Sequence, residues 1–223
     1  MSAQYLRPAV LFVAALALAP ATVLSAQADP DRTVAGGGTL PTGWNARTDR
    51  NAPMANVKFA AMGTGFHVTL GPATIFWRDA DTVSVGFHGV ASFAQTKAPT
   101  HPEAYGLFLG GKNLGDSTQS YTYFLVRTKA DTGQFSIWRR TGAGRPTAVV
   151  GWTTNAAVNG ADAAGKATNE LSFLVQGGTV KFMVNGKDVH TANATDVDSQ
   201  GVVGYRINHN LEVHVGPLGV HRM

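Results

Sequence analysis

Residues 179–191 read TVKFMVNGKDVHT, which is two short alternating runs joined by Asn185 and Gly186. Asn-Gly is a preferred pair for the two-residue type I′ turn, because both central residues of that turn need a positive φ. The apolar-polar alternation on either side is the period-two pattern of a β-strand. The stretch therefore predicts a tight β-hairpin, and its turn sets the register of the two strands.

The same pattern recurs from Val57 to the end of the chain. Gly, Pro, Asn or Asp separates short alternating or apolar runs, and no stretch of a dozen residues carries a helical apolar stripe. At most a short helical turn is expected, around Asn159 to Gly165. No internal repeat of fixed period is visible, which argues against a propeller or a solenoid. The chain is therefore predicted to be all-β.

One strand indicates how the sheets pack. The run SYTYFLVRT, residues 120–128, has one set of alternate residues that suits a core and another that mixes aromatic with polar character. The first set is Thr122, Phe124 and Val126, and the second is Tyr121, Tyr123, Leu125 and Arg127. Half-polar faces of this kind favour a two-sheet antiparallel β-sandwich over a closed barrel.

The start of the chain has the features of a secretory signal peptide. One charge, Arg7, precedes the apolar run of residues 9–19, and the small residues Ala26-Gln27-Ala28 suit a cleavage site. The run is shorter than the ~20 residues that a membrane-spanning helix needs. We therefore expect removal of residues 1–28, a polar leader rich in Gly and Pro over 29–56, and one jelly-roll domain over 57–223. The protein is predicted to be secreted or periplasmic, without a membrane span after cleavage.

The composition also bears on the covalent features and the partners of the chain. The chain contains no Cys, so neither a disulfide framework nor a lipid on an N-terminal cysteine is possible. Its net charge is +4, and the basic residues are scattered rather than clustered in a stripe, which does not favour nucleic acid as a partner. No cofactor is predicted, and the oligomeric state is left open.

The order of the hairpins resembles the concanavalin A-like lectin/glucanase superfamily, and within it the laminin-G-like and keto-disaccharide-hydrolase-like bacterial secreted domains. The resemblance covers about residues 57–220. The runs that carry it are AYGLFLGGKN, YTYFLVRTKADTGQFSIWRR, VVGW, NELSFLVQGGTVKFMVNGKDVHT and GVVGYRINHNLEVHV. The resemblance implies a jelly-roll sandwich and a glycan ligand, either a polysaccharide or a cell-surface sugar.

The sequence departs from the catalytic branches of that superfamily. Its retaining glucanases carry an E-x-D-x-x-E strand, since two carboxyls about 5 to 5.5 Å apart are needed for double displacement. Here the only glutamates are Glu103, Glu170 and Glu212, and none has an acidic partner at that spacing. The Asp79/Asp81 and Asp196/Asp198 pairs lack the further carboxylates of a Ca²⁺ or Mn²⁺ site, and the seven histidines show no chelating spacing. No catalytic or metal-ligating residue is therefore predicted.

Two sets of residues are candidates for sugar binding. Aromatic side chains could stack on sugar rings from the concave face of one sheet, and a following arginine could bind an anionic glycan such as a uronate. These candidates are Tyr121, Tyr123, Trp138 and Arg140. The same aromatic residues could equally fill a core.

The closing strand and one long loop add further candidates. Arg206 and Asn208 lie on the polar side of the closing strand, and Lys112 and Asn113 lie in the glycine-rich loop 110–121. Glu212 and His214 share the polar side, where they could act as acid and base or simply form a solvated face. The loop could contact a ligand or serve only as a mobile connection.

Three functions remain open at this stage. The favoured one is a secreted, lectin-like carbohydrate-binding module without readable catalytic residues. The alternatives are a glycan-cleaving hydrolase or lyase of the same fold, and a structural or interaction protein of the cell envelope. The sequence leans against an enzyme without deciding the matter, because a fold does not determine an activity.

Overall fold

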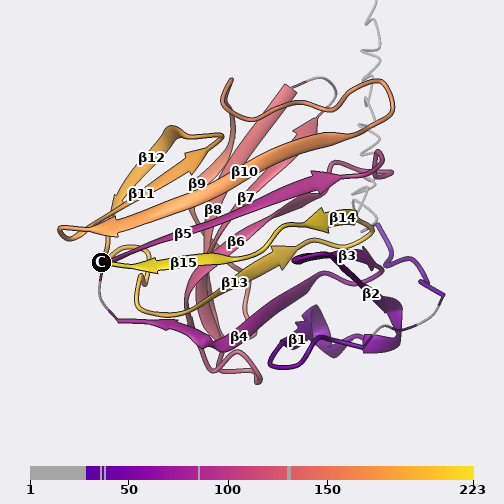
Figure 1. Cartoon of the computed structure of the whole chain (residues 1–223), viewed down its shortest axis with the longest axis horizontal. Helices are drawn as coiled ribbons and strands as arrows, with labels where there is room; N and C mark the ends of the chain where they lie inside the picture. Colours follow the sequence, from indigo (N-terminus) through magenta and orange to yellow (C-terminus); the bar gives the residue numbers. More distant parts are fainter. Residues whose placement is uncertain (1–28, 36, 38, 85, 130–131) are drawn as a thin grey trace, which may run out of the picture.

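The computed structural model describes residues 29–223, except residues 36, 38, 85, 130 and 131. The expected signal peptide, residues 1–28, lies outside the described residues. Two antiparallel sheets lie one over the other (Figure 1). The two-sheet sandwich predicted from the alternation is therefore confirmed. Within the described residues, no helix is both long enough and apolar enough to cross a membrane.

Sheet A has seven strands in the described part of the chain. In spatial order these are β1 (Asn45–Thr48), β4 (Thr74–Val83), β13 (Gly201–Ile207), β6 (Ala104–Lys112), β7 (Ser120–Lys129), β8 (Thr132–Thr141) and β9 (Thr147–Thr154). The neighbours β6, β7, β8 and β9 follow one another in sequence, so this half of the sheet is a meander of hairpins. The other half brings β13, near the C-terminus, between β4 and β6.

Sheet B packs against one face of sheet A. In spatial order its strands are β12 (Lys187–Asn193), β11 (Thr179–Val184), β10 (Ala167–Gln176), β5 (Phe87–Gln95), β14 (Glu212–Val215), β3 (Gly65–Leu70) and β2 (Val57–Met62), and β15 (Gly219–Arg222) also pairs with β5. The hairpin predicted at Asn185-Gly186 joins β11 to β12. Both turn residues have positive φ, 50° and 74°, as a type I′ turn requires.

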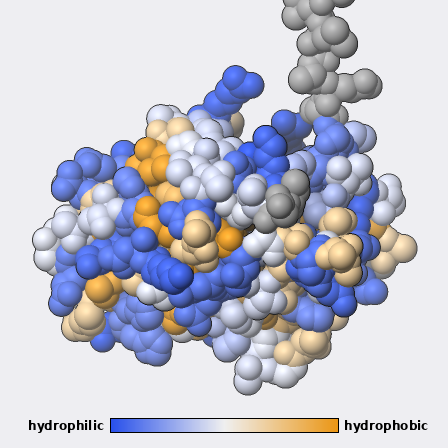
Figure 2. Space-filling view, turned by 90° about the horizontal axis from the view of Figure 1, so that it is seen from above, coloured by the Kyte–Doolittle hydropathy of each residue, from blue (hydrophilic) through white to orange (hydrophobic). Residues whose placement is uncertain are grey.

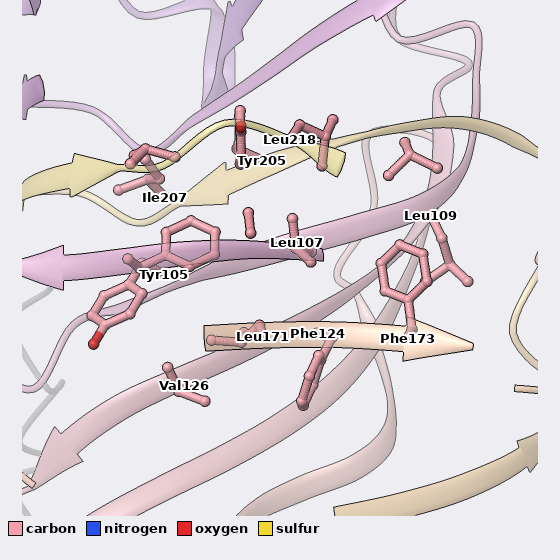
Figure 3. Packing of buried hydrophobic residues seen from close by; sticks show 14 of the residues in the cluster. Tyr105, Leu107, Leu109, Phe124, Val126, Leu171, Phe173, Tyr205, Ile207 and Leu218 are labelled. Carbon is pink, nitrogen blue, oxygen red and sulfur yellow. The ribbon is translucent and has the colours of Figure 1, made fainter. Parts of the chain in front are cut away.

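The core lies between the two sheets. Phe124 and Val126 of β7 point into it, opposite Leu171 and Phe173 of β10 (Figure 3). The set of β7 residues predicted to face a core therefore does so. Outside the core, the surface seen in Figure 2 is mainly hydrophilic, and its hydrophobic residues form small, separate patches.

The single-turn helices are found elsewhere than expected. Residues 159–165 form turns without a helix, whereas two 3₁₀ turns, η1 (Asp49–Asn51) and η2 (Met54–Asn56), lie in the predicted leader. The leader also contributes β1, which pairs with β4 at the edge of sheet A. No strand pattern is readable in the sequence of β1, Asn-Ala-Arg-Thr, so this strand was not predicted. β1 helps to position the candidate site, because η1, which begins with Asp49, follows it directly.

Candidate functional site

The face of sheet A that points away from sheet B carries a second apolar cluster. Such a face is usually polar, because it meets solvent. Here it holds Ile75, Trp77, Ala104, Phe108, Leu114, Tyr121, Tyr123 and Leu125, with Trp138, Trp152 and Val202 half-buried beside them. Leu114 comes from the loop after β6, which therefore folds over one end of this face. We call this surface the outer face of sheet A.

Arg206 of β13 and Asp49 of η1 form an ion pair on this face. The two terminal nitrogens of Arg206 donate to the two carboxylate oxygens of Asp49, each at 2.7 Å. Burial favours neutral Arg206, since only 5% of the residue is exposed, but Asp49 outweighs burial and raises the pKa of Arg206. Burial likewise opposes ionisation of Asp49, yet the nearby guanidinium groups, Arg206 foremost, lower its pKa. Both groups are therefore charged at neutral pH.

Two more arginines surround the same carboxylate. Arg140 of β8 places Nη2 3.6 Å from Asp49, and Arg47 of β1 is close enough to help lower the pKa of Asp49. Three positive charges thus surround Asp49, and Arg47 also adds to the effect of the hydrogen bonds that lower the pKa of the exposed Asp116. Arg47 Nη1, Arg140 Nε and Arg206 Nε are buried and have no hydrogen-bond acceptor among the described residues. The site has an excess of positive charge and of N–H donors.

Tyr121 and Tyr123 lie beneath these arginines. The Arg206 guanidinium carbon is 5.7 Å from the centre of the Tyr123 ring. Burial raises the pKa of Tyr121, and it raises the pKa of Tyr123 to about 12. The Tyr121 hydroxyl is also buried, without a partner among the described side chains and backbone groups. Both tyrosines are therefore neutral, and the hydroxyl of Tyr121 remains an unused donor.

A hollow of about 460 Å³ opens beside Arg206. Its lining consists of Asp29, Asp31, Asp49, Arg50, Ala73, Glu103, Arg206, Asn208 and His209. His209 bridges two acids there, with Nδ1 3.0 Å from Asp31 and Nε2 2.8 Å from Glu103. The hydrogen bond to Glu103, assisted by the charges of both acids, raises the pKa of His209. We call the part around His209, with Asp29, Asp31 and Glu103, the acidic end of the hollow. Elsewhere in the lining, Arg206 is paired with Asp49.

The acidic end contains the residue types of a cation site. One potential ligand atom from each of Asp29, Glu103 and His209 lies within 4.8 Å of the other two. However, each ring nitrogen of His209 already faces a carboxylate, as a protonated imidazole does. Hydrogen bonds and ion pairs account for this cluster, so we assign no metal to it.

The structure brings most of the predicted binding residues together. Tyr121, Tyr123, Trp138, Arg140 and Arg206 share the outer face, and Asn208 lines the hollow. The tyrosines are less open than expected, because Tyr121 exposes 0% and Tyr123 7% of its surface. Their rings support the site from below and offer no free face to a sugar. Their role in binding stays a prediction.

The loop residues are placed differently. Lys112 and Asn113 are exposed, and Lys112 lines a separate hollow of about 260 Å³ beside Asp198 and Ser199. Asn113 adopts a positive φ of 51° in the turn after β6. Neither lines the hollow beside Arg206, so a contact between them and a ligand held there stays a prediction without geometric support.

Glu212 and His214 lie on the other sheet. His214 packs edge-on against His67 of β3, with ring centres 4.6 Å apart, and Glu212 pairs with Lys97 at 2.5 Å. Both belong to the solvent-facing side of sheet B and lie apart from the arginine cluster. Of the two interpretations of Glu212 and His214, a solvated face is the one that fits their positions.

Sequence reasoning missed Arg47, Asp49 and His209 as members of the site. Arg47 and Asp49 fall in the leader, which shows no strand pattern, and His209 shows no chelating spacing. The available signal was the abundance of arginine on one parity of the sheet A strands. An arginine-rich face suggests that an acidic residue lies nearby, but the pattern could not show that this residue is Asp49.

Comparison with known proteins supports the fold. No protein-family model matches the sequence, and no curated protein is similar to it. Among solved structures, a carbohydrate-binding module from Bacillus subtilis, CBM66, has a TM-score of 0.55 at 14% identity, over 81% of this chain and 96% of that one. A β-glucanase from Bacillus licheniformis has a TM-score of 0.52 at 14% identity, over 88% and 100%. The chain has the concanavalin A-like jelly-roll fold.

A third similar structure is alginate lyase A1-II′, a member of polysaccharide lyase family 7. Its TM-score is 0.52 at 8% identity, over 81% of this chain and 96% of that one. At these identities the likeness shows the jelly-roll fold alone. The predicted fold is therefore confirmed, whereas the chemistry of the outer face has to be argued from its own residues.

Proposed function

We propose that this protein is a lectin-like carbohydrate-binding protein that holds a glycan against the outer face of sheet A. The observation that carries the proposal is the cluster of arginines and aromatic rings on the outer face of sheet A, in which Arg206 is buried and Arg47 and Arg140 are half-buried. Such a surface is costly to maintain, because buried charges and unpaired donors lose their hydration. The unpaired donors are themselves enclosed, so a ligand rich in hydroxyl groups would bind the open parts of the half-buried Arg47, Arg140 and Trp138 beside them.

Each part of the site has a role in this proposal. Trp138 is half-buried, so part of its ring stays open to stack on a sugar. Arg140 and Asn208 donate hydrogen bonds to sugar oxygens, while Tyr121 and Tyr123 support the arginines from below. The similarity to a structure named as a carbohydrate-binding module agrees with this assignment.

Glycan cleavage is the second candidate, and one observation favours it. Glu103 and Asp29 approach within 4.8 Å of one another in the hollow, which is near the separation of about 5 to 5.5 Å used by retaining glycosidases. The similar structures include one named as a glucanase and one named as an alginate lyase. Against cleavage, Glu103 is already engaged by His209. An envelope scaffold is the remaining alternative, in which the outer face binds no glycan.

Binding of the purified protein to a broad glycan array tests the proposal. We expect selective binding, and we expect Trp138→Ala to weaken it at least about tenfold, an effect on the order of 1.4 kcal/mol. Met62→Ala on β2 is the matched control, because Met62 is an exposed apolar residue on the other sheet. The proposal fails if no glycan binds, or if Trp138→Ala binds as well as the natural chain. Product release from the bound glycan that is lost in Glu103→Gln would establish cleavage instead.

We further propose that the protein is exported, by a signal peptide over residues 1–28. The support is the sequence pattern, a single charge followed by an apolar run and Ala26-Gln27-Ala28. Mass spectrometry of the protein recovered from the producing cells tests this. A mature chain beginning at Asp29 is expected, and a chain that keeps Arg7 in the cytoplasm would contradict it.

A further inference from the structure

We infer that the glycan bound at the outer face of sheet A carries a carboxylate, and that Arg140 and Arg47 receive it. This inference rests on the proposed function and names the chemical class of its ligand. Three arginines converge on Asp49, and the further acid near Arg47, Asp116, is exposed to solvent, so positive charge exceeds negative charge in the cluster. An excess of charge held in a poorly solvated place is stabilised by an anionic ligand.

Asp49 shows which anion this cluster accepts. Its planar carboxylate matches the guanidinium of Arg206, with both oxygens at 2.7 Å from the two terminal nitrogens. That bidentate pair uses one N–H of Arg206 Nη1 and one of Nη2. Arg140 stands further from Asp49, at 3.6 Å, and Arg47 Nη1 has no acceptor among the described residues. Both side chains are only half-buried, so a second carboxylate can bind their open parts.

The next residue on β8 provides an internal contrast. Arg139 has the opposite parity to Arg140, and its Nη2 lies 2.7 Å from Asp198. Arg139 therefore has its own counter-ion, whereas Arg140 shares one with Arg206 and Arg47. Arg139 Nε, like Arg140 Nε, has no acceptor among the described residues, so the two arginines differ in their counter-ions and not in this unpaired donor.

The residues that line the hollow also indicate how the glycan is oriented. The acidic end holds Asp29, Asp31 and Glu103, which repel a carboxylate but accept hydrogen bonds from hydroxyl groups. Arg140 does not line the hollow, but its Nη2 lies 3.6 Å from Asp49, which does. The acidic sugar is therefore placed outside the hollow at Arg140, and a neutral part of the glycan lies toward Glu103. A chain in which uronic acids are linked to neutral sugars fits this arrangement better than a chain charged at every residue.

Calorimetry with matched polymers tests the inference. The probes are hyaluronan and polygalacturonate, the carboxyl-reduced neutral form of each, and dextran sulfate with dextran. We expect at least about tenfold tighter binding to hyaluronan than to its reduced form, which corresponds to one charge-assisted hydrogen-bonded contact. Polygalacturonate should bind less tightly than hyaluronan, because of the acidic end of the hollow.

Two variants locate the effect. Arg140→Gln should abolish the preference for hyaluronan over its reduced form, and it should weaken binding of the reduced form less than binding of hyaluronan. Arg139→Gln is the control from the same strand and should keep the preference. Arg47→Gln provides a second test of the site if Arg140→Gln is poorly folded, as judged by thermal unfolding.

The outcomes separate the inference from the proposed function. Equal binding to the charged and reduced polymers overturns the carboxylate and leaves carbohydrate binding intact. Tighter binding to dextran sulfate than to either uronate also overturns it, in favour of a sulfate ester. Absence of binding to every polymer overturns the inference, and the broad glycan array then decides whether the proposed function fails with it.

Discussion

Asp49 is the counter-ion on which the buried Arg206 depends. Removing one partner of a buried pair leaves the other charge uncompensated, which costs about 3 to 5 kcal/mol. Because 28% of the Asp49 side chain is exposed, we expect Asp49→Ala to lower the free energy of unfolding by about 3 kcal/mol, at the lower end of that range. Urea denaturation measures this change. Asp188→Ala, which removes an exposed partner of Lys181, should cost about 1 kcal/mol or less.

Lowering the pH should remove part of the same stabilisation from the natural chain, because it protonates Asp49. The pKa of Asp49 is lower in the folded protein than its ordinary value. Its contribution to stability is therefore complete above that ordinary value and disappears as the pH falls through the lowered one. An Asp49→Ala variant that loses as much stability on acidification as the natural chain would contradict this role.

His209 titrates with the opposite sign. Its hydrogen bond to Glu103, and the charges of Glu103 and Asp31, raise its pKa. The protonated ring therefore stabilises the folded state fully below the ordinary pKa of histidine, and this contribution is lost as the pH rises through the raised value. We expect His209→Gln to lower the melting temperature more at about pH 5 than at about pH 9.

His190→Gln is the control for this prediction. Burial lowers the pKa of His190, so protonation of this residue destabilises the fold at low pH. Its replacement should matter less, or even help, at the lower pH. Equal effects of His209→Gln at both pH values would show that the bridge between Asp31 and Glu103 does not depend on charge.

The hairpin of β11 and β12 does more than reverse the chain. The Asn185 side chain donates to the carbonyl of Ala157 at 2.8 Å and to the side chain of Asn169 at 2.9 Å, and it accepts from the backbone N–H of Glu170 at 2.8 Å. The turn is thereby fastened to β10 and to the loop after β9. We expect Asn185→Ala to cost about 4 kcal/mol, from three hydrogen bonds of about 1 kcal/mol each and about 1 kcal/mol of strain for alanine at a positive φ.

Asn185→Gly separates the two roles of this residue. Glycine adopts the positive φ of 50° without strain but makes none of the side-chain hydrogen bonds. It should therefore be more stable than Asn185→Ala by about 1 kcal/mol, while remaining well below the natural chain. Chemical denaturation of the three chains measures both differences. A glycine variant as stable as the natural chain would mean that the hydrogen bonds contribute nothing.

At the level of strands, the sequence predicts which face of the sheet a side chain points to better than it predicts whether that side chain is exposed. The alternation in β7 correctly separates Phe124, which faces the core, from Tyr121, which faces outward. It does not reveal that Tyr121 is buried, because the side chains that cover it come from other segments, such as Leu114 in the loop after β6. Period two reports which side of a sheet a residue occupies, and not what lies above that side.

For the molecule as a whole, strand alternation likewise predicts only those site residues that lie in clearly patterned strands. Arg140 and Arg206 belong to clear strands, so they could be nominated from the sequence. Their common neighbour, Asp49, depends on the pairing of Ala46 with Phe76 and of its neighbours along β1. That register is set by contacts between distant segments, and no local pattern encodes it.

The leader is therefore expected to be part of the fold. Trp44 stacks on Tyr205 with ring centres 5.4 Å apart, and β1 covers the edge strand β4. Arg32 fastens the first described residues, since its side chain donates to the carbonyls of Leu70 at 2.9 Å and Leu211 at 3.0 Å. These contacts hold Asp49 over Arg206. Without them, an apolar edge and a buried charge would be exposed together.

Two truncated chains test this view. A chain that begins at Asp29 keeps every one of these contacts and should unfold cooperatively, with the melting temperature of the mature protein. A chain that begins at Val57 retains the strands predicted from the sequence but lacks Asp49 and Trp44, so we expect it to melt at a lower temperature and to aggregate along the open edge of β4. Circular dichroism with light scattering during heating measures both properties. If the shorter chain melts as the longer one does, residues 29–56 are a dispensable leader, and Arg206 needs no counter-ion from them.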